Sequence, residues 1–198
     1  RPVCCGRTYL TVGKIAEAKR EAGRLLDTFF PYTSRDIPVI GLEPSCLLCL
    51  RDEIPALLPG AKADSVTGKA MLFEEFWVAE QPSVELQPVA PKALVHGHCH
   101  QKAFGAVKPV QEVLGRIPAL EVEMIDSSCC GMAGVFGYGS ETYGVSMEMA
   151  ELSLFPAIRG ADPETQIVAD GASCRHQIEH GTSRTAQHVA RLLKRALA

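Results

Sequence analysis

Apolar residues recur every three to four positions through residues 14–30, with charged residues between them. This spacing predicts an amphipathic helix, and we expect Pro31 to end it because proline lacks a backbone N–H. A short apolar run at residues 37–42 predicts a buried strand. Ser45 then suits the N-cap of a second helix, and residues 70–79 predict a third. The first half of the chain thus contains helices on both sides of a strand.

The second half continues this alternation. Apolar runs predict strands at residues 93–98 and 166–170, and alternating polar and apolar residues predict one at residues 120–125. Helical spacing predicts helices at residues 110–116, 143–159 and 185–198, with Pro156 near the end of the second. This order is typical of parallel sheets, because a parallel connection needs a crossover of about a dozen or more residues.

The proline-rich residues 80–92 predict a linker between two halves. We therefore divide the chain into a first half at residues 1–85 and a second half at residues 86–198. Because Arg1 to Val3 lead directly into a cysteine pair, we expect the first half to be truncated at its N-terminus. The predicted fold class is α/β: two pseudo-repeated halves with parallel strands flanked by helices, and cysteine loops at the C-terminal ends of strands.

The composition is that of a globular protein. Of 198 residues, 46% are hydrophobic and 22% are charged, which suffices for a sizeable core. The net charge of −3 gives no reason to expect nucleic acid as a partner. No apolar run approaches the roughly 18–20 residues that a membrane-spanning helix needs.

Eight cysteines form two interrupted copies of one pattern, a Cys-Cys-Gly triplet followed by a later cysteine. Most of them follow predicted strands, at the sheet edge where helix N-termini also point. Clustered thiolates at such an edge can hold an iron–sulfur cluster or zinc. The candidate metal ligands are Cys4, Cys5, Cys46, Cys49, Cys99, Cys129, Cys130 and Cys174.

Two other roles for these cysteines compete with metal binding. A disulfide framework is disfavoured, because adjacent cysteines bond to each other only with strain and such scaffolds are usually shorter. Individual cysteines could instead be small buried residues of the core. This alternative is strongest for Cys49, which lies one helical turn past Cys46.

Three histidines crowd one predicted strand: His96, His98 and His100. Strand alternation places all three opposite Cys99, so we expect them not to bind the same metal as Cys99. A structural role is favoured over a proton relay. His176, two residues after Cys174, could contact a metal-bound cysteine.

The glycine-rich residues 134–139 do not match a dinucleotide-binding fingerprint. We expect these glycines to let the backbone turn tightly beside Cys130. No Ser/His/Asp arrangement and no paired carboxylates stand out. We therefore assign neither catalytic residues nor an organic cofactor site to this chain.

Five motifs resemble the cysteine-rich CCG region of heterodisulfide reductase and of the iron–sulfur parts of glycolate and lactate oxidases. The resemblance covers nearly the whole chain. The second half is most similar to the C-terminal region of FAD-linked fusion proteins that act on D-2-hydroxy acids such as D-lactate or D-2-hydroxyglutarate. The motifs are Cys4-Cys5-Gly6-Arg7, Glu43-Pro44-Ser45-Cys46, His96-Gly97-His98-Cys99-His100-Gln101-Lys102, Ser128-Cys129-Cys130-Gly131-Met132-Ala133-Gly134 and Ser173-Cys174-Arg175-His176-Gln177.

The resemblance implies an electron-transfer domain of a flavin-dependent 2-hydroxy-acid oxidoreductase. Its cysteines would hold a [4Fe–4S] cluster, and FAD would lie only in another part of the full-length protein. The implied partners are FAD-binding and ferredoxin-like modules of the same or a partner chain, with peripheral contact to a membrane quinone pool as a further option. We expect a cytoplasmic location, either free or peripheral to the inner face of the cytoplasmic membrane. The chain alone should lack dehydrogenase activity.

The sequence departs from the family pattern at two places. No cysteine precedes Cys4, and Gln177 stands where the pattern has a final cysteine. The second half therefore suits a four-cysteine cluster or zinc better than a five-cysteine noncubane cluster. Two alternatives stay open: a thiol/disulfide redox module like heterodisulfide reductase, and a zinc-stabilised docking domain without catalytic activity.

Overall fold

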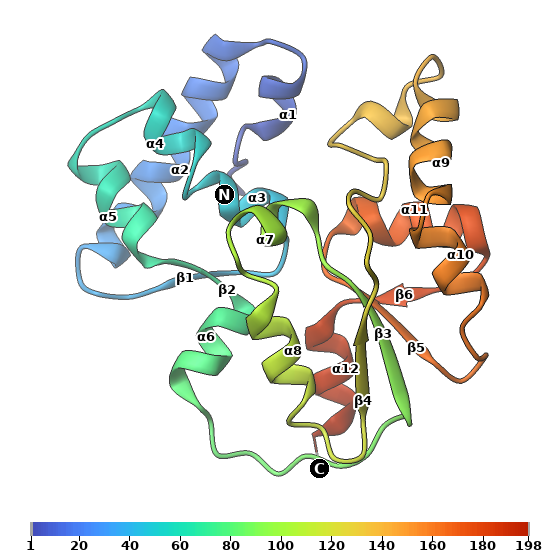
Figure 1. The fold of residues 1–198 in the computed structure, drawn as a ribbon. Helices are drawn as coiled ribbons and strands as arrows, with labels where there is room; N and C mark the ends of the chain where they lie inside the picture. The colour runs from blue at the N-terminus through green and yellow to red at the C-terminus, as the bar shows by residue number, and fades with distance from the viewer. Residues whose placement is uncertain (1, 198) are drawn as a thin grey trace. The chain divides into compact units, whose positions relative to one another are not determined.

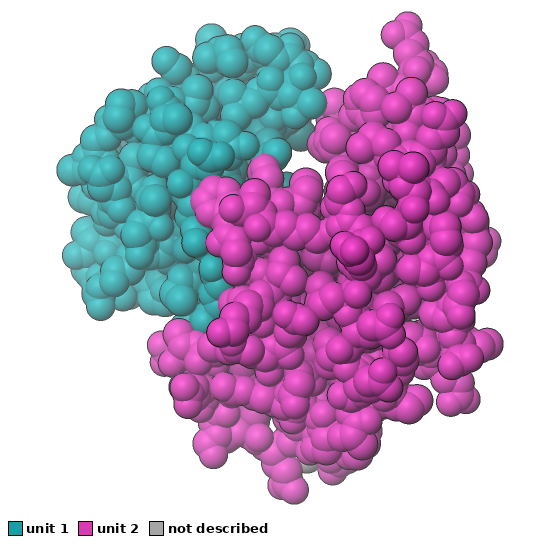
Figure 2. Space-filling model, viewed as in Figure 1, with its two compact units in different colours: residues 1–76 teal, residues 77–198 magenta. Residues whose placement is uncertain are grey.

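The computed structural model describes residues 2–197 as two compact units, Arg1–Phe76 and Trp77–Ala198 (Figure 2). Both units contain parallel strands with helices packed against them, so the predicted α/β class is confirmed. None of the described helices is long and apolar enough to cross a membrane.

The first unit is built around a small parallel sheet. Val39 pairs with Ala70, and the two strands continue in register for three residues. The strands are β1 (Val39–Gly41) and β2 (Ala70–Leu72), and the helices are α1 (Arg7–Thr11), α2 (Ile15–Thr33), α3 (Pro44–Cys49), α4 (Glu53–Leu57) and α5 (Ala61–Lys69). Helix α6 (Phe73–Glu80) contains the point where the units divide.

Pro31 does not end α2, contrary to the prediction. The helix continues to Thr33, with Pro31 in its last turn. A proline so close to the end removes only one helical hydrogen bond, and the side chain of Thr33 is tied to Ser65 by a 2.9 Å hydrogen bond. The proline therefore precedes the helix end instead of marking it.

Two further boundaries in the first unit differ from the prediction. Helix α3 is capped by Glu43, whose carboxylate accepts from the N–H of Ser45 at 3.4 Å, so Ser45 is not the cap. The predicted helix at residues 70–79 begins as β2 and becomes helical only at Phe73. Pairing with β1 buries Ala70 and Leu72, and this tertiary contact overrides the local preference.

The second unit has a four-stranded, all-parallel sheet in the order β4-β3-β5-β6. In Figure 1, α8 and α12 lie on one side of this sheet, and α10 and α11 lie on the other. The strands are β3 (Lys92–His96), β4 (Glu121–Met124), β5 (Gln166–Ala169) and β6 (Ala186–Gln187). The helices are α7 (Cys99–Ala103), α8 (Lys108–Leu114), η1 (Phe136–Tyr138), α9 (Tyr143–Glu151), α10 (Leu154–Arg159), α11 (Ala172–Thr182) and α12 (Val189–Ala196).

Two predicted helices of the second unit are shorter than expected. Residues 143–159 form two helices, α9 and α10, and Pro156 lies in the first turn of α10, where its missing N–H is not needed. Residues 185–198 begin with β6, and α12 starts only after His188, whose side chain accepts from the N–H of Ala190 at 3.0 Å.

One side of the second unit's sheet faces a core that contains two of the cysteines. Leu94 and Ile167 are paired across β3 and β5, and both belong to this core. Phe155 and Ile178 contribute from α10 and α11. The other buried members, or members packed at its edge, include Ile125, Met132, Ala150, Leu154, Ile158, Ala169, Cys130 and Cys174. The core thus extends directly to the cysteine loops.

Candidate metal centres

The second-half cysteines lie just beyond the C-terminal ends of three neighbouring strands. Strand β3 is followed by Cys99, β4 by Cys129 and Cys130, and β5 by Cys174. Because parallel strands end at the same edge of a sheet, these residues come together there. Their thiols affect one another's pKa values in neighbouring pairs, Cys99 with Cys129, Cys129 with Cys130, and Cys130 with Cys174, so the four sulfurs form a continuous series. The structure therefore brings together all four second-half candidates.

This series runs from the surface into the core. Cys99 is exposed and Cys129 is half-buried, whereas Cys130 and Cys174 are buried among the apolar residues of the sheet core. All eight cysteines of the chain fall within the described residues, and all are free thiols. A group bound here would have one edge near solvent and the rest shielded from it.

Hydrogen bonds between the sulfurs separate them into thiolates and thiols. The pKa of Cys129 is lowered by hydrogen bonds from the thiols of Cys130 and Cys99. The pKa of Cys174 is lowered by a hydrogen bond from Cys130 and further by His96. The pKa values of the donors Cys99 and Cys130 are raised by the same bonds. Two of the four sulfurs, those of Cys129 and Cys174, thus favour the thiolate, which is the form that binds metals.

The glycine of each Cys-Cys-Gly triplet shapes its loop in the same way. Gly131 has a φ of +93°, and its N–H donates to Cys129 Sγ at 3.3 Å. Gly6 has a φ of +80°, and its N–H donates to Cys4 Sγ at 3.4 Å. A Cβ on Gly131 would lie 2.1 Å from the carbonyl oxygen of Ser146, which no side chain could accommodate. The repeated triplet therefore corresponds to a repeated backbone geometry.

The first-half cysteines gather around Cys5. Its Sγ lies 3.4 Å from Cys46 Sγ, and hydrogen bonds from Cys46 and then Cys49 lower the pKa of Cys5 well below its ordinary value. The pKa values of Cys46 and Cys49 are raised, chiefly by these bonds. Cys49 is buried, yet its sulfur also lies 3.7 Å from the carbonyl oxygen of Cys5. Cys4 is exposed at the edge of this group.

The histidines do not follow the predicted alternation, because β3 ends at His96 and α7 begins at Cys99. His98 caps α7: its side chain accepts from the N–H of His100 at 3.1 Å, and Gln101 Oε1 accepts from the N–H of His98 at 3.1 Å. Only His96 lies on the strand itself. The prediction that all three share one face opposite Cys99 was therefore wrong.

His96 is a site residue that the sequence reasoning missed. It is 1% exposed, and a ring nitrogen lies within 4.8 Å of both Cys130 Sγ and Cys174 Sγ. Its Nδ1 is 2.8 Å from Ser127 Oγ. The signal that could have found it is the strand period, which puts His96 on the same face as the core residue Leu94.

His176 and Gln177, two and three residues after Cys174, make their hydrogen bonds elsewhere. His176 is exposed, and its Nδ1 lies 2.9 Å from the hydroxyl of Tyr138. Gln177 is buried, and its amide donates to the carbonyl oxygen and Oγ of Ser146 at 3.1 and 3.0 Å. Gln177 thus joins α11 to α9 at the position where the family pattern has a cysteine.

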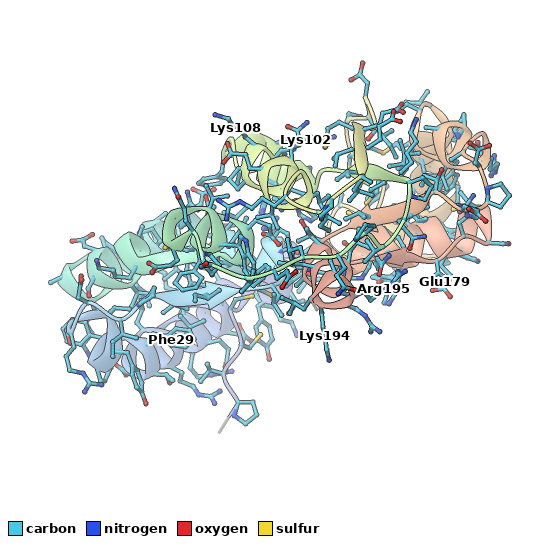
Figure 3. The ribbon with its side chains drawn as sticks, turned by 90° about the horizontal axis from the view of Figure 1, so that it is seen from below. Phe29, Lys102, Lys108, Glu179, Lys194 and Arg195 are labelled. Atoms are coloured by element: carbon cyan, nitrogen blue, oxygen red, sulfur yellow. The ribbon has the colours of Figure 1, made fainter. Side chains whose placement is uncertain are left out.

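Lys102 supports the second-half site from the end of α7 (Figure 3). Its ammonium group donates to the carbonyl oxygens of Ser127 and Ser128, immediately before Cys129. Burial lowers the pKa of Lys102, while the nearby cysteine thiolates oppose this effect. This lysine therefore fixes the loop that carries Cys129 and places a positive charge near the thiolates.

Relatives of the chain are found among dehydrogenases. The chain is 32% identical over 202 residues to a subunit of the anaerobic glycerol-3-phosphate dehydrogenase of Escherichia coli (strain K12), covering 98% of this chain and 50% of that relative. It is 26% identical over 191 residues to D-2-hydroxyglutarate dehydrogenase of Pantoea ananatis (strain AJ13355), covering 95% and 18%. It is 28% identical over 194 residues to D-2-hydroxyglutarate dehydrogenase of Escherichia coli (strain K12), again covering 95% and 18%.

The chain therefore spans half the length of the first relative and less than a fifth of the other two. No protein-family model matches the chain, and no solved structure matches it.

Proposed function

Because the chain belongs to the cysteine-rich CCG-domain family, we propose that it transfers electrons for a dehydrogenase through an iron–sulfur cluster held by Cys99, Cys129, Cys130 and Cys174. The observation that carries this proposal is the continuous series of four sulfurs at one edge of the second unit's sheet. Four thiolates are the ligand set of a [4Fe–4S] cluster. This set fits the group, because Cys129 and Cys174 already favour the thiolate form and the inner half of the site is shielded by apolar residues.

The cluster would serve as a relay. When bound, it would accept and release single electrons, while the chain's own residues hold and insulate it. The exposed Cys99 marks the side from which an electron partner would approach, and buried Cys174 marks the side closed to solvent. Lys102 would offset part of the negative charge that the thiolates bring to the site.

Substrate oxidation would take place outside this chain. We propose a flavin-dependent dehydrogenase of 2-hydroxy acids as the enzyme served, supported by the similarity to two D-2-hydroxyglutarate dehydrogenases. The similarity to one subunit of a glycerol-3-phosphate dehydrogenase supports a role next to other modules. These would be FAD-binding and ferredoxin-like modules of the same or a partner chain, in the cytoplasm or at the inner face of the cytoplasmic membrane beside a quinone pool.

The first unit would hold a second centre. Cys5, Cys46 and Cys49 meet there, and exposed Cys4 stands next to them. Either an iron–sulfur cluster or zinc suits this set. Metal analysis of the separate cysteine variants distinguishes these two occupants.

The test begins with anaerobic purification and measurement of iron, acid-labile sulfide and zinc. We expect the wild-type protein to contain iron and about an equal amount of sulfide. Cys129→Ser and Cys174→Ser should each contain less of both, because serine oxygen is a poor ligand for such clusters. The matched control is Ser128→Ala, which changes an exposed neighbour and should leave the metal content unchanged. Zinc without sulfide in the wild-type protein would instead support a docking domain and contradict the electron-transfer proposal.

The second measurement uses the complete dehydrogenase. Cys129→Ser should leave stopped-flow reduction of the flavin by its substrate nearly unchanged, and it should slow turnover with the electron acceptor by about ten- to a hundredfold. Comparing D-2-hydroxyglutarate, D-lactate and glycerol 3-phosphate as reductants would identify the substrate class. Unchanged acceptor turnover in a variant that has lost its iron would rule out the relay.

A further inference from the structure

We propose that His96 is a nitrogen ligand of the metal centre in the second unit, next to Cys130 and Cys174. This inference rests on the proposed function, because it requires a metal at that site. His96 would be a fifth ligand beside the four thiolates, so one iron would bind an imidazole nitrogen in addition to a cysteine sulfur. A ring nitrogen of His96 and the sulfurs of Cys130 and Cys174 are buried and lie within 4.8 Å of one another, which supports this inference.

His96 has a buried polar atom that the described residues leave without a hydrogen-bond partner. The Nε2 of His96 is buried and has no hydrogen-bond partner within the part of the chain that the structure describes. Buried polar atoms are nearly always satisfied, and an exception calls for a specific explanation such as an ion. A metal bound by Cys130 and Cys174 would satisfy Nε2 where the protein itself does not.

A hydrogen bond orients the imidazole ring of His96. Nδ1 of His96 lies 2.8 Å from Ser127 Oγ, so this nitrogen is already engaged. Ser127 is itself held, because its N–H donates to the carbonyl oxygen of Ile125 at 2.9 Å and its carbonyl oxygen accepts from Lys102. Histidines that bind metals typically use one ring nitrogen for the metal and fix the other by such a hydrogen bond. The arrangement leaves Nε2 as the nitrogen available to a metal.

The sheet register determines the face on which His96 lies. His96 is the last residue of β3 and pairs with Ala169 of β5. Leu94 and Ile167, which pair two residues earlier, have their side chains on the same face of the sheet as His96. This face packs against the core that includes Cys130 and Cys174. The backbone of a central strand thus sets the direction of the imidazole. The position does not depend on a mobile surface side chain.

Imidazole ligation has a measurable consequence for the centre. In iron–sulfur proteins in which histidine replaces cysteine as a ligand, the reduction potential is higher than with cysteine alone. A centre with His96 among its ligands should therefore be easier to reduce than one with cysteine ligands only. Changing His96 to cysteine should lower the potential.

The test is pulsed electron paramagnetic resonance of the anaerobically prepared protein after one-electron reduction. The expected result is a strong ¹⁴N coupling of a directly bound imidazole, which changes to a ¹⁵N pattern when the protein is made with [¹⁵N]histidine. His96→Asn should abolish the coupling. The matched control is His176→Asn, since His176 lies two residues from Cys174 but is exposed and bonded to Tyr138. That variant should retain the coupling.

Several results would overturn the inference. A wild-type cluster whose spectrum shows no bound nitrogen would overturn it and leave the proposed function standing, as would a weak coupling typical of a hydrogen bond to sulfur. A coupling that persists in His96→Asn would assign the nitrogen elsewhere. A wild-type protein that assembles no iron–sulfur centre would overturn both proposals. If His96→Asn fails to fold, the isotope experiment on the wild-type protein decides alone, and His96→Cys should bind iron without nitrogen coupling.

Discussion

Gln101 and Asp170 are joined by a buried hydrogen bond, in which the amide of Gln101 donates to Asp170 Oδ2 at 2.9 Å across 69 residues of sequence. Gln101 belongs to α7, the helix that begins at Cys99, and Asp170 follows β5, just before the helix that carries Cys174. The other carboxylate oxygen of Asp170 accepts from the N–H of Val189 at 3.0 Å. One carboxylate therefore links two cysteine-bearing segments to the start of α12.

Replacing Asp170 with asparagine should destabilise the protein. The variant loses two hydrogen bonds to a buried charge, each worth about 1.5–3 kcal/mol, while the amide keeps some contacts, so we expect a net loss of about 2–3 kcal/mol. Chemical denaturation of the metal-free protein measures this. Asp162→Asn, at an exposed position, serves as control. A change below about 0.5 kcal/mol for Asp170→Asn would show that this carboxylate does not hold the segments together.

Gly131→Ala should disrupt the second Cys-Cys-Gly loop. The new Cβ would meet the Ser146 carbonyl oxygen at 2.1 Å in a backbone conformation with φ of +93°, so we expect a loss of at least about 2 kcal/mol and reduced iron content. The matched control is Gly144→Ala in α9, where a Cβ meets nothing within 4 Å and helix propensity should stabilise the protein by about 0.5–1 kcal/mol. Equal stability of the two variants in thermal denaturation would contradict this account.

Lys102→Met should loosen the loop before Cys129. Losing the bonds to the Ser127 and Ser128 carbonyl oxygens should cost about 1–3 kcal/mol and speed amide hydrogen exchange in residues 127–131. Lys108 provides the control, because its side chain is 82% exposed and its ion pair with Glu112 lies on the surface (Figure 3). If the amides of residues 127–131 exchange at the same rate in Lys108→Met and Lys102→Met, the anchoring role of Lys102 is refuted.

In the metal-free protein, Cys5 should react as a thiolate even below neutral pH. Its lowered pKa means that the charged form persists as the pH falls, so alkylation by iodoacetamide should stay fast at about pH 6. Cys46→Ala removes the largest stabilising hydrogen bond, so the pKa of Cys5 should rise and alkylation at that pH should slow. Mass spectrometry of the labelled peptide at several pH values gives the midpoint pH at which alkylation of Cys5 is half its maximal rate.

Ser45→Ala is the control for this measurement, since it changes the residue next to Cys46 and leaves both sulfurs in place. The midpoint should not move in that variant. A wild-type midpoint near the roughly 8.5 of an ordinary cysteine would show that the contact between Cys5 and Cys46 does not stabilise a thiolate.

Strands β3, β4 and β5 could be predicted because their apolar runs are local features, whereas α7, α11 and β6 were not predicted. Strand β2 could not be predicted, since Ala70 to Leu72 become a strand only by pairing with β1, about thirty residues earlier in the chain. Pro31 misled the prediction of where α2 ends. Proline excludes few positions near a helix end, so its presence does not fix where the helix stops.

The sequence could predict that the second-half cysteines lie near one another, but it could not predict that His96 lies beside them. The repeated triplet with its glycine identifies Cys129 and Cys130 without any structure, because the motif carries its own backbone geometry. His96 looked like one of three equivalent histidines. The structure separates them, because β3 ends at His96, whereas His98 caps α7 and His100 lies within that helix.

The gradient from exposed Cys99 to buried Cys174 also bears on durability. Oxidants and chelators arrive from solvent, and the susceptibility of a thiol follows its exposure. Damage to a bound centre should therefore begin at Cys99 and spare the sulfurs packed beneath the sheet core. A protein that has lost its metal in this way would keep its innermost cysteines reduced. Repair would then require restoring only the exposed end of the series, at Cys99.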